Sequence, residues 1–444
     1  GRSYFELAME GRSLHRSQRQ GTLELRGPRS SNLRLLSSAA PSSPEALVAP
    51  MFSGIDTSIV GIPSLAGAPA STLAAELAAA QAAAAHALAA FQPLTPHTTL
   101  PSILEGLEAI RRARGRLAAP GLDPSVRDEL DFRLNAKEED FADAAIRAAG
   151  IVVDPLAAEE TIVPGESLSV TVKTFIPSSA PARVVSARVS SPEGWRVEPS
   201  APAAVAPGGR GRGAPETARH EATFRVTVPA SAPATEPYWL ARARPSRALF
   251  WWPDSAPKGQ PFGPPILEAE VDLALGTSTI AVRRPVEFRV ADPIRGELRR
   301  RVDVVPALSV SVDTPLAIVP VSNASSRRDL VVQAENLARS PIEGRLRVQV
   351  PPGWSVSPAD APFSLARPGE RASARFTVTI PPTARVGRYN LDATASANGI
   401  DYASTVTAIA YPHIQTHRLY SAVTTEVQVL DLRTPTVTVG YISG

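Results

Sequence analysis

Three side chains near the start of the chain have the types and the spacing of a group that contacts a substrate. Arg12, His15 and Gln18 follow one another at three-residue intervals in the stretch GRSLHRSQ. On a helix this spacing places them on one face, where Arg and His could donate hydrogen bonds to substrate oxygens. The stretch therefore predicts the rim of an active-site pocket. The alternative is a polar helix face that packs against a neighbouring part of the protein.

Two adjacent tryptophans form a second candidate site. Trp251 and Trp252 lie in a proline-rich stretch that also contains Phe250 and Phe262. A cluster of large aromatic side chains on a surface is suited to stacking on sugar rings. We therefore predict a carbohydrate-stacking surface at these two residues, with a plug between domains as the alternative.

Other constellations indicate no complete catalytic centre in this chain. His413 and His417 have the H-x-x-x-H spacing of helical zinc sites, but Pro412 precedes them, and neither a third ligand nor a glutamate base accompanies them. We interpret that segment as a connector. The sequence contains neither a G-x-S-x-G nor a phosphate-binding G-x-x-x-x-G-K-[ST] pattern. We predict no catalytic residue and no metal ligand here.

The composition excludes several classes of function. The chain has 444 residues, with 46 Lys and Arg against 43 Asp and Glu, so its net charge is +3. A nucleic-acid binder would need a larger and clustered positive charge. The absence of cysteine excludes disulfides, thiolate zinc sites and a cysteine nucleophile. The longest apolar stretch is mostly alanine and carries polar residues, so we expect no transmembrane segment.

The first third of the chain is predicted to be mainly helical. Residues 1 to about 20 have a helical apolar pattern, and a Ser- and Pro-rich stretch comes next, so that 37–70 is predicted as a linker and docking segment. Residues 71–150 predict a bundle of three helices. Their predicted boundaries are a capping box at Ser102 and Glu105, a cap at Asp123, and a stop at Gly150.

From residue 151 the pattern changes to short strands bounded by Pro and Gly. Two stretches repeat one another: Trp195 aligns with Trp354, and Phe224 with Phe376. The repeat predicts two tandem immunoglobulin-like β-sandwiches, at 151–302 with an insertion and at 303–412. Because the two tryptophans repeat in register, we interpret both as core residues. The last segment, 413–444, ends in VTVGYISG, which predicts the first strand of a truncated α/β domain.

Several of these segments resemble one enzyme family, in that family's order. GRSYFELAMEGRSLHRSQRQG is similar to the end of the catalytic domain in bacterial PIG-L/LmbE-type zinc N-deacetylases, and FSGIDTSIVGI is similar to the next segment of those proteins. PPGWSVSPADAPFSL and RFTVTIPPTARVGRYNL resemble the NPCBM-associated NEW-type domain, an immunoglobulin-like module of sugar-active enzymes, and VEFRVADPIRGELRRRVDVVPALSV resembles the join between such modules.

The resemblance implies a mainly β multidomain chain that begins with the tail of an α/β catalytic domain, at 1–36. It implies a parent hydrolase that removes acetyl from an N-acetylated amino sugar with zinc-activated water. The family's H-P-D-D motif is absent from this sequence, so zinc is expected in a missing catalytic domain, and this chain alone is expected to be inactive. It also implies a carbohydrate partner and an exported bacterial protein, with the compartment and the oligomeric state left open.

Two other functions remain open at this point. One is a non-enzymatic scaffold or adhesion protein built from sandwich repeats. The other is a carbohydrate-binding module with its own site, for which Trp251 and Trp252 should be exposed and coplanar.

Overall fold

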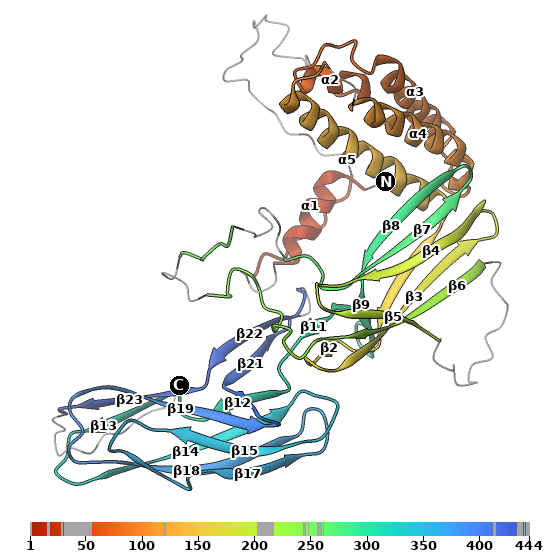
Figure 1. Ribbon diagram of the computed structural model, residues 1–444. Coiled ribbons are helices and arrows are strands. Elements are labelled where there is room, and N and C mark those ends of the chain that lie inside the picture. Colours follow the sequence, from red (N-terminus) through yellow and green to blue (C-terminus); the bar gives the residue numbers. More distant parts are fainter. Residues whose placement is uncertain are drawn as a thin grey trace, which may run out of the picture.

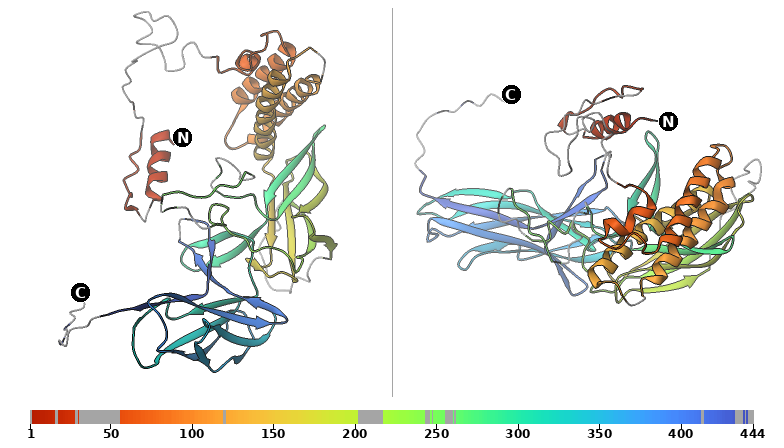
Figure 2. Two further views of the ribbon diagram at one scale, coloured as in Figure 1. Left: turned by 60° about the vertical axis from the view of Figure 1, so that its left-hand side comes forward. Right: turned by 90° about the horizontal axis from the view of Figure 1, so that it is seen from above.

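The chain is arranged as a helical bundle followed by two β units. In the computed structural model (Figures 1 and 2) the bundle lies at one end, the first β unit lies in the middle, and the second β unit lies at the other end. A separate N-terminal helix lies apart from the bundle (Figure 2). The structure describes residues 2–15, 18–27, 30, 56–118, 121–201, 217–242, 246, 248–254, 260, 262–411, 414–432, 438 and 440.

The bundle contains the three helices that the sequence predicts, together with shorter turns that lead into them. Part of the predicted docking segment is also helical and packs on the bundle through the buried Ile62. The helical elements are α1 (Tyr4–Ser13), η3 (Ile59–Gly61), α2 (Ile62–Leu65), α3 (Ala74–Ala90), η4 (Pro96–Thr99), α4 (Leu100–Arg116) and α5 (Pro124–Ala148).

One of the predicted helix boundaries is wrong and two are confirmed. Asp123 caps α5 by accepting a hydrogen bond from the Ser125 amide, and Gly150 follows the helix end with a φ of +67°. The capping box at Ser102 does not form, because α4 already begins at Leu100. Pro101 has a fixed φ and no N–H, which suits the first turn of a helix, and η4 leads directly into it.

The first β unit consists of two sheets. One has the strand order β10-β9-β1-β3-β6-β5 and the other β4-β7-β8. The short strand β2 pairs in parallel with β11, the last strand before the chain enters the second unit. The bounds are β1 (Val152–Ala157), β2 (Thr161–Ile162), β3 (Ser167–Pro177), β4 (Ala182–Ser190), β5 (Arg196–Ser200), β6 (Thr217–Thr227), β7 (Glu268–Leu275), β8 (Ser278–Pro285), β9 (Glu287–Asp292), β10 (Gly296–Arg301) and β11 (Asp303–Val304).

The second β unit also has two main sheets, of order β12-β14-β18-β16 and β13-β23-β19-β15-β17, while β21 and β22 form a separate hairpin. The bounds are β12 (Leu308–Val312), β13 (Leu316–Pro320), β14 (Ser326–Asn336), β15 (Ile342–Gln349), β16 (Ser355–Ser357), β17 (Ala361–Leu365), β18 (Arg371–Ile380), β19 (Gly387–Ala397), β20 (Ile400–Tyr402), β21 (Ser404–Ile409), β22 (His417–Ala422) and β23 (Thr424–Leu430).

The predicted boundary at residue 412 is therefore wrong. β23 lies inside the second unit, between β13 and β19, and its alternate residues Thr425, Val427 and Val429 are buried in that unit's core. The physical reason is that β19 and β13 both need a partner along their edges, and β23 supplies it from a distant part of the sequence. The terminal run VTVGYISG lies largely outside the described residues.

The repeat seen in the sequence corresponds to repeated strand pairing. Trp195 directly precedes β5, which pairs with β6, and Trp354 directly precedes β16, which pairs with β18. Phe224 on β6 and Phe376 on β18 are both buried. The order β1-β3-β6-β5 in the first unit thus corresponds to β12-β14-β18-β16 in the second. The chain is a mainly β, multidomain sandwich structure with a helical region in front.

The bundle and the first β unit share one continuous hydrophobic core, whereas the second unit has its own. Two hydrogen bonds fix α4 on the turn between β7 and β8. Arg111 donates to the Thr279 carbonyl oxygen at 2.9 Å, and Ser278 donates to the Glu108 carboxylate, also at 2.9 Å. The bundle therefore serves as a packed extension of the first unit.

Candidate functional site

A pocket of about 340 Å³ lies where the two β units meet. The first unit contributes the turn around Trp195 and two stretches of the long connection between β6 and β7. The second unit contributes the residues that enter β22. The polypeptide that joins the units, 301–304, closes one side. The lining residues are Pro192, Trp195, Pro233, Ala234, Thr235, Glu236, Pro237, Trp239, Phe262, Gly263, Pro264, Pro265, Ile266, Val286, Arg301, Val302, Asp303, Val304, Gln415, Thr416, His417 and Arg418.

Most of the pocket is built from segments in which the two β units differ. The connection 228–267 between β6 and β7 corresponds to the short connection 381–386 between β18 and β19. A two-residue turn connects β7 to β8 in the first unit. The corresponding connection in the second unit, from β19 to β23, is residues 398–423, which include the β21–β22 hairpin. Because these insertions are not needed to complete the shared strand order, their meeting at one pocket marks it as the candidate site.

Aromatic rings form one wall of the pocket. The His417 ring stacks on Phe262, with centroids 5.2 Å apart and an angle of 18° between the planes, and it meets Trp239 edge-on at 6.0 Å. The Arg301 guanidinium also lies over Phe262, 5.0 Å from the ring centroid, and it donates to the Gly263 carbonyl oxygen at 2.8 Å. Trp195 is half-buried against the core of the first unit.

An ionic cluster lies behind this wall and connects the two units. Arg418 on β22 forms ion pairs with Glu160, at 2.6 Å, and with Asp303. Arg300 pairs with the other oxygen of Glu160 at 2.6 Å. Burial raises the pKa of Asp303 above its ordinary value even though Arg418 lies against it. Burial also raises the pKa of the neighbouring Tyr420, which donates to the Val304 carbonyl oxygen at 3.3 Å.

Glu236 differs from these paired carboxylates. In the part of the chain that the structure describes, its side chain has neither a hydrogen-bond partner nor an ion-pair partner. Desolvation at the pocket wall raises its pKa although the residue as a whole is exposed, and no neighbouring positive charge opposes that shift. The pocket therefore combines aromatic faces, uncommitted polar groups at Glu236 and His417, and a rigid frame rich in proline.

Protonation of His417 should weaken the junction at acidic pH. Burial lowers the pKa of His417, and the nearby Arg301 lowers it further. Glu236 and Asp303 are the acidic groups that line the same pocket. Because the unfolded chain binds this proton more readily, the stabilisation present above about pH 6.5 is lost as pH falls toward the lowered value. We expect the free energy of unfolding to fall between pH 7 and pH 5 by less in His417→Phe than in the natural chain. Urea denaturation at pH 7 and at pH 5 measures the free energy of unfolding of both proteins. An equal fall in the two proteins would contradict the prediction.

The structure does not place Arg12, His15 and Gln18 on one helical face. α1 ends at Ser13, and the chain then turns, so that His15 and Gln18 follow the helix. All three side chains are exposed, and Arg12 donates to Gln20 at 3.2 Å. The interruption follows from Gly11, which weakens the last helical turn. In the described structure these residues line neither of the two larger pockets.

Trp251 and Trp252 lie beside the junction pocket without lining it. The Arg242 guanidinium covers the Trp251 ring at 3.8 Å from its centroid, and Trp252 is 47% exposed. Trp252 meets Tyr238 edge-on at 5.1 Å, and Tyr238 meets Trp239 in the same way at 4.9 Å. The insertion thus carries a chain of aromatic contacts that leads from Trp252 to the pocket wall.

From the sequence, both repeated tryptophans are interpreted as core residues. Trp354 is one, whereas Trp195 is only partly buried. Trp354 is 9% exposed and packs against Tyr389 with centroids 5.0 Å apart. Trp195 packs partly on the core and also lines the pocket. The reason is that the first unit's long insertion folds beside Trp195, whereas the corresponding connection in the second unit is short.

Sequence reasoning missed Trp239, Phe262, Glu236 and Arg301 as residues of one site. A signal was present, since the 228–267 insertion contains most of the aromatic side chains of the first unit. His417, interpreted as part of a connector, also lines the pocket, while His413 lies outside the described residues.

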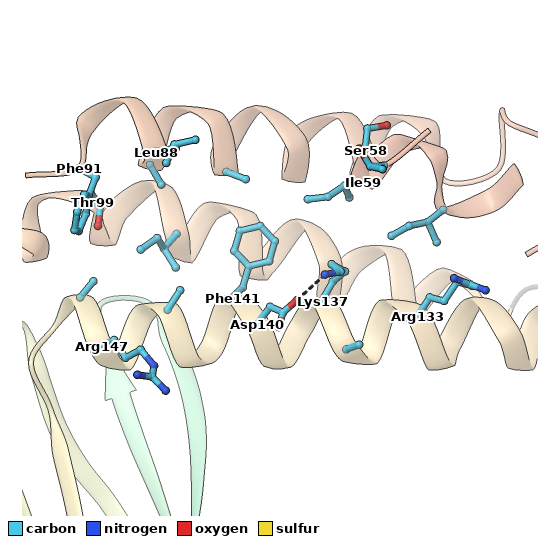
Figure 3. Close-up of a pocket in the computed structure, with 18 of the residues that line it drawn as sticks. Ser58, Ile59, Leu88, Phe91, Thr99, Arg133, Lys137, Asp140, Phe141 and Arg147 are labelled. Atoms are coloured by element: carbon cyan, nitrogen blue, oxygen red, sulfur yellow. Dashed lines mark hydrogen bonds and ion pairs between the residues drawn. The ribbon is translucent and has the colours of Figure 1, made fainter. Parts of the chain in front are cut away.

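A second, larger pocket of about 970 Å³ runs along the helical bundle (Figure 3). It lies between α3 and α5, and Phe141 projects from α5 toward it. The Phe141 ring occupies the space beside Gly106 on α4, where a Cβ atom would come within 2.3 Å of it. The lining is largely aliphatic and aromatic, and Lys137 is paired with Asp140 at 2.6 Å. Such a surface offers few free groups for the hydroxyls of a sugar.

The described side chains form no cluster suited to a metal ion. Among the residues that the structure describes, no group of three or more His, Asp or Glu side chains is placed to hold one. None of the helices in the described ranges has the length and the apolar character that crossing a membrane requires.

One protein family matches part of the chain. Residues 324–398 match the family described as the NPCBM-associated, NEW3 domain of alpha-galactosidase. The matched stretch runs from the start of β14 to the end of β19 and so lies within the second β unit. It is a carbohydrate-associated β domain. No curated protein matches the chain.

Solved structures resemble this chain only weakly. WR4, an MSP family member of C. elegans, is 9% identical with a TM-score of 0.17, over 27% of this chain and 97% of that one. Native alpha-2-macroglobulin from Escherichia coli, spanning MG7 to the C-terminus, is 15% identical with a TM-score of 0.19, over 28% and 16%. A family 123 glycoside hydrolase from Clostridium perfringens is 14% identical with a TM-score of 0.18, over 29% and 28%. This chain therefore spans less than a third of the macroglobulin and hydrolase chains, and these scores carry no argument about function.

Proposed function

We propose that this chain is a non-catalytic, carbohydrate-binding portion of a sugar-active enzyme, and that the junction pocket is its binding site. The observation that carries the proposal is the meeting of Trp195, Trp239 and Phe262 with uncommitted polar groups in a pocket built from two insertions. The match of the second unit to a domain of alpha-galactosidase supports the same substrate class.

The physical argument rests on the two faces of a sugar. A pyranose ring has an apolar C–H face, which packs on aromatic rings, and hydroxyls, which require placed hydrogen-bonding groups. Small-molecule pockets are mostly apolar with a few such polar groups, at volumes of about 300–1,000 Å³. The junction pocket lies at the small end of that range, so we expect it to hold one or two sugar units of a longer chain.

Replacing Trp239 with alanine should weaken oligosaccharide binding at least about tenfold, because the ring supplies packing area that alanine lacks. The measurement is isothermal titration calorimetry of the whole chain with oligomers of galactose, glucosamine and N-acetylglucosamine. Trp252→Ala is the matched control, since that ring lies in the same insertion but outside the pocket. If Trp252→Ala loses affinity for the oligosaccharide and Trp239→Ala does not, the sugar binds at the exposed Trp252 instead. That result would overturn the assignment of the pocket.

A narrower proposal concerns the parent enzyme. We infer that it is a zinc-dependent N-deacetylase of an N-acetylated amino sugar, because residues 1–21 and 52–62 resemble segments of that family. The resemblance alone supports this step. Zinc content and acetate release should be measured on this chain and on a longer natural protein that contains it. We expect stoichiometric zinc and acetate release in the longer protein and neither in this chain. If the longer protein also lacks both, the proposal is refuted.

The two β units are further proposed to be copies of one immunoglobulin-like module. The support is the corresponding strand order of the two units, together with a tryptophan directly before β5 (Trp195) and another directly before β16 (Trp354). In this proposal the first copy gained the β6–β7 insertion and the second gained the β21–β22 hairpin, which together make the pocket.

A further inference from the structure

Three described carboxylates, Glu160, Asp303 and Glu236, lie in or directly behind the junction pocket, and two of them are paired with arginines. Glu160 pairs with Arg300 and Arg418, and Asp303 pairs with Arg418. Glu236 has no such partner within the described ranges. The pocket therefore presents one spare negative charge to whatever it binds.

Glu236 is held at the pocket by its neighbour in the chain. The Thr235 amide donates to the Val304 carbonyl oxygen at 2.9 Å, and the Thr235 hydroxyl accepts from the Val304 amide at 2.9 Å. Pro237 follows and restricts the backbone on the other side. Glu236 thus stands at a fixed place on the wall, three residues before Trp239, and its charge contributes to raising the pKa of Tyr420.

The arginines of the pocket are committed elsewhere. Arg418 is engaged by Glu160 and Asp303, and Arg301 donates to the Gly263 carbonyl oxygen and lies over Phe262. Burial and the charge of Arg301 lower the pKa of His417, whereas no arginine in the described ranges pairs with Glu236. Glu236 is exposed and unpaired in the described structure, so it is free to pair with a cation that a ligand brings.

We propose that Glu236 makes the junction pocket selective for amino sugars that carry a free, protonated amine, over the same sugars in N-acetylated form. The inference rests on the proposed carbohydrate-binding function and adds the class of sugar. An ammonium group beside the sugar ring can donate charge-assisted hydrogen bonds to Glu236, while the ring packs on Trp239 or Trp195. An acetamido group carries no charge and is bulkier, so it leaves Glu236 unneutralised.

The aromatic wall favours the same ligand. Tryptophan faces attract organic cations through the ring quadrupole, and the attraction grows as water is excluded. The half-buried rings of Trp195 and Trp239 border the same pocket as Glu236. A protonated amine is therefore stabilised both by a carboxylate and by aromatic faces, whereas a neutral sugar gains only from the packing.

Calorimetry of the whole chain with two β-1,4-linked oligomers of equal length, one of glucosamine and one of N-acetylglucosamine, tests the proposal at pH 6. We expect the glucosamine oligomer to bind about tenfold more tightly, which corresponds to one charge-assisted hydrogen bond at a partly exposed site. Glu236→Gln should abolish that preference, so that the ratio of the two affinities falls to about one, whatever its effect on the affinity for either oligomer. Because Glu236 has no partner in the described structure, this variant should fold normally.

Glu193→Gln is the matched control, since Glu193 is an exposed carboxylate in the turn beside Trp195 and does not line the pocket. A preference that persists in Glu236→Gln, or that Glu193→Gln removes equally, overturns the proposal. If both oligomers bind equally and Trp239→Ala still weakens that binding, the proposed selectivity is overturned. The proposed carbohydrate-binding function then still stands. Binding of neither oligomer, with galactose oligomers bound, also overturns it, and binding of no sugar refutes both proposals.

Discussion

Replacing Arg418 with leucine is expected to lower the free energy of unfolding by about 3–5 kcal/mol, the range for removing one partner of a buried ion pair. Arg418 is 10% exposed, and it contacts both Glu160 and Asp303, which are 17% and 12% exposed. Without the guanidinium, Asp303 loses its ion-pair partner and lies close to Glu160, which keeps only Arg300. The pKa of Asp303 is already raised by burial, so part of the response should be its protonation.

Urea denaturation followed by tryptophan fluorescence measures this effect, because Trp195 and Trp239 lie at the same junction. Arg388→Leu is the control: Arg388 also forms an ion pair, with Glu426 at 3.8 Å, but is 77% exposed. Exposed pairs contribute at most about 1 kcal/mol. If the two variants lose similar stability, the buried cluster does not hold the junction together. A larger loss at pH 7 than at pH 4 is also expected, because protonated carboxyl groups no longer repel each other.

Replacing Gly344 with alanine is expected to cost about 3 kcal/mol of unfolding free energy, at the upper end for overpacking a well-filled core. Gly344 lies in β15, between β17 and β19. A Cβ atom there would lie 2.3 Å from the carbonyl oxygen of Ser396 and 2.7 Å from the Phe363 ring. The ring can turn, but the carbonyl belongs to a central strand, so the sheet itself must shift.

Gly387→Ala provides the matched comparison within the same sheet. Gly387 begins β19, and a Cβ atom added to it would come no nearer than 3.9 Å to any neighbour. That substitution should change stability by no more than about 0.5 kcal/mol, as surface changes away from special features do. Thermal unfolding monitored by circular dichroism compares the two variants. Equal melting temperatures would show that the second unit accommodates a side chain at Gly344 without strain.

The sequence alone predicted the elements whose signals are local. The bundle helices α3, α4 and α5 follow from helical propensity, and the start of α5 from Asp123. The corresponding strand pairs of the two units were predicted from the spacing of Trp195 and Trp354 and of two strand patterns. These features depend on residues within one turn or one strand of each other, which is why they can be recognised without knowing what packs against them.

Signals that depend on distant partners led to wrong predictions. The segment that forms β23 has an alternating apolar pattern, which predicts a strand but does not say which sheet it joins. It pairs with β19 after an excursion through β20, β21 and β22. The face expected at Arg12, His15 and Gln18 does not form for a local reason instead, since α1 ends at Ser13, two residues after Gly11.

The junction pocket was decided by the tertiary structure. Trp195, Trp239, Phe262 and His417 come together from four separate stretches of the chain, and no spacing in the sequence relates them. The repeated sequence pattern predicted the strand pairs β5–β6 and β16–β18, in which Phe224 and Phe376 are both buried. The site is built from segments in which the two units differ, and where those segments meet depends on how the units pack. Local sequence thus determined the helices and the strand patterns, because those signals lie within one turn or one strand, while long-range packing brought Glu236 and His417 to one pocket lined by aromatic rings.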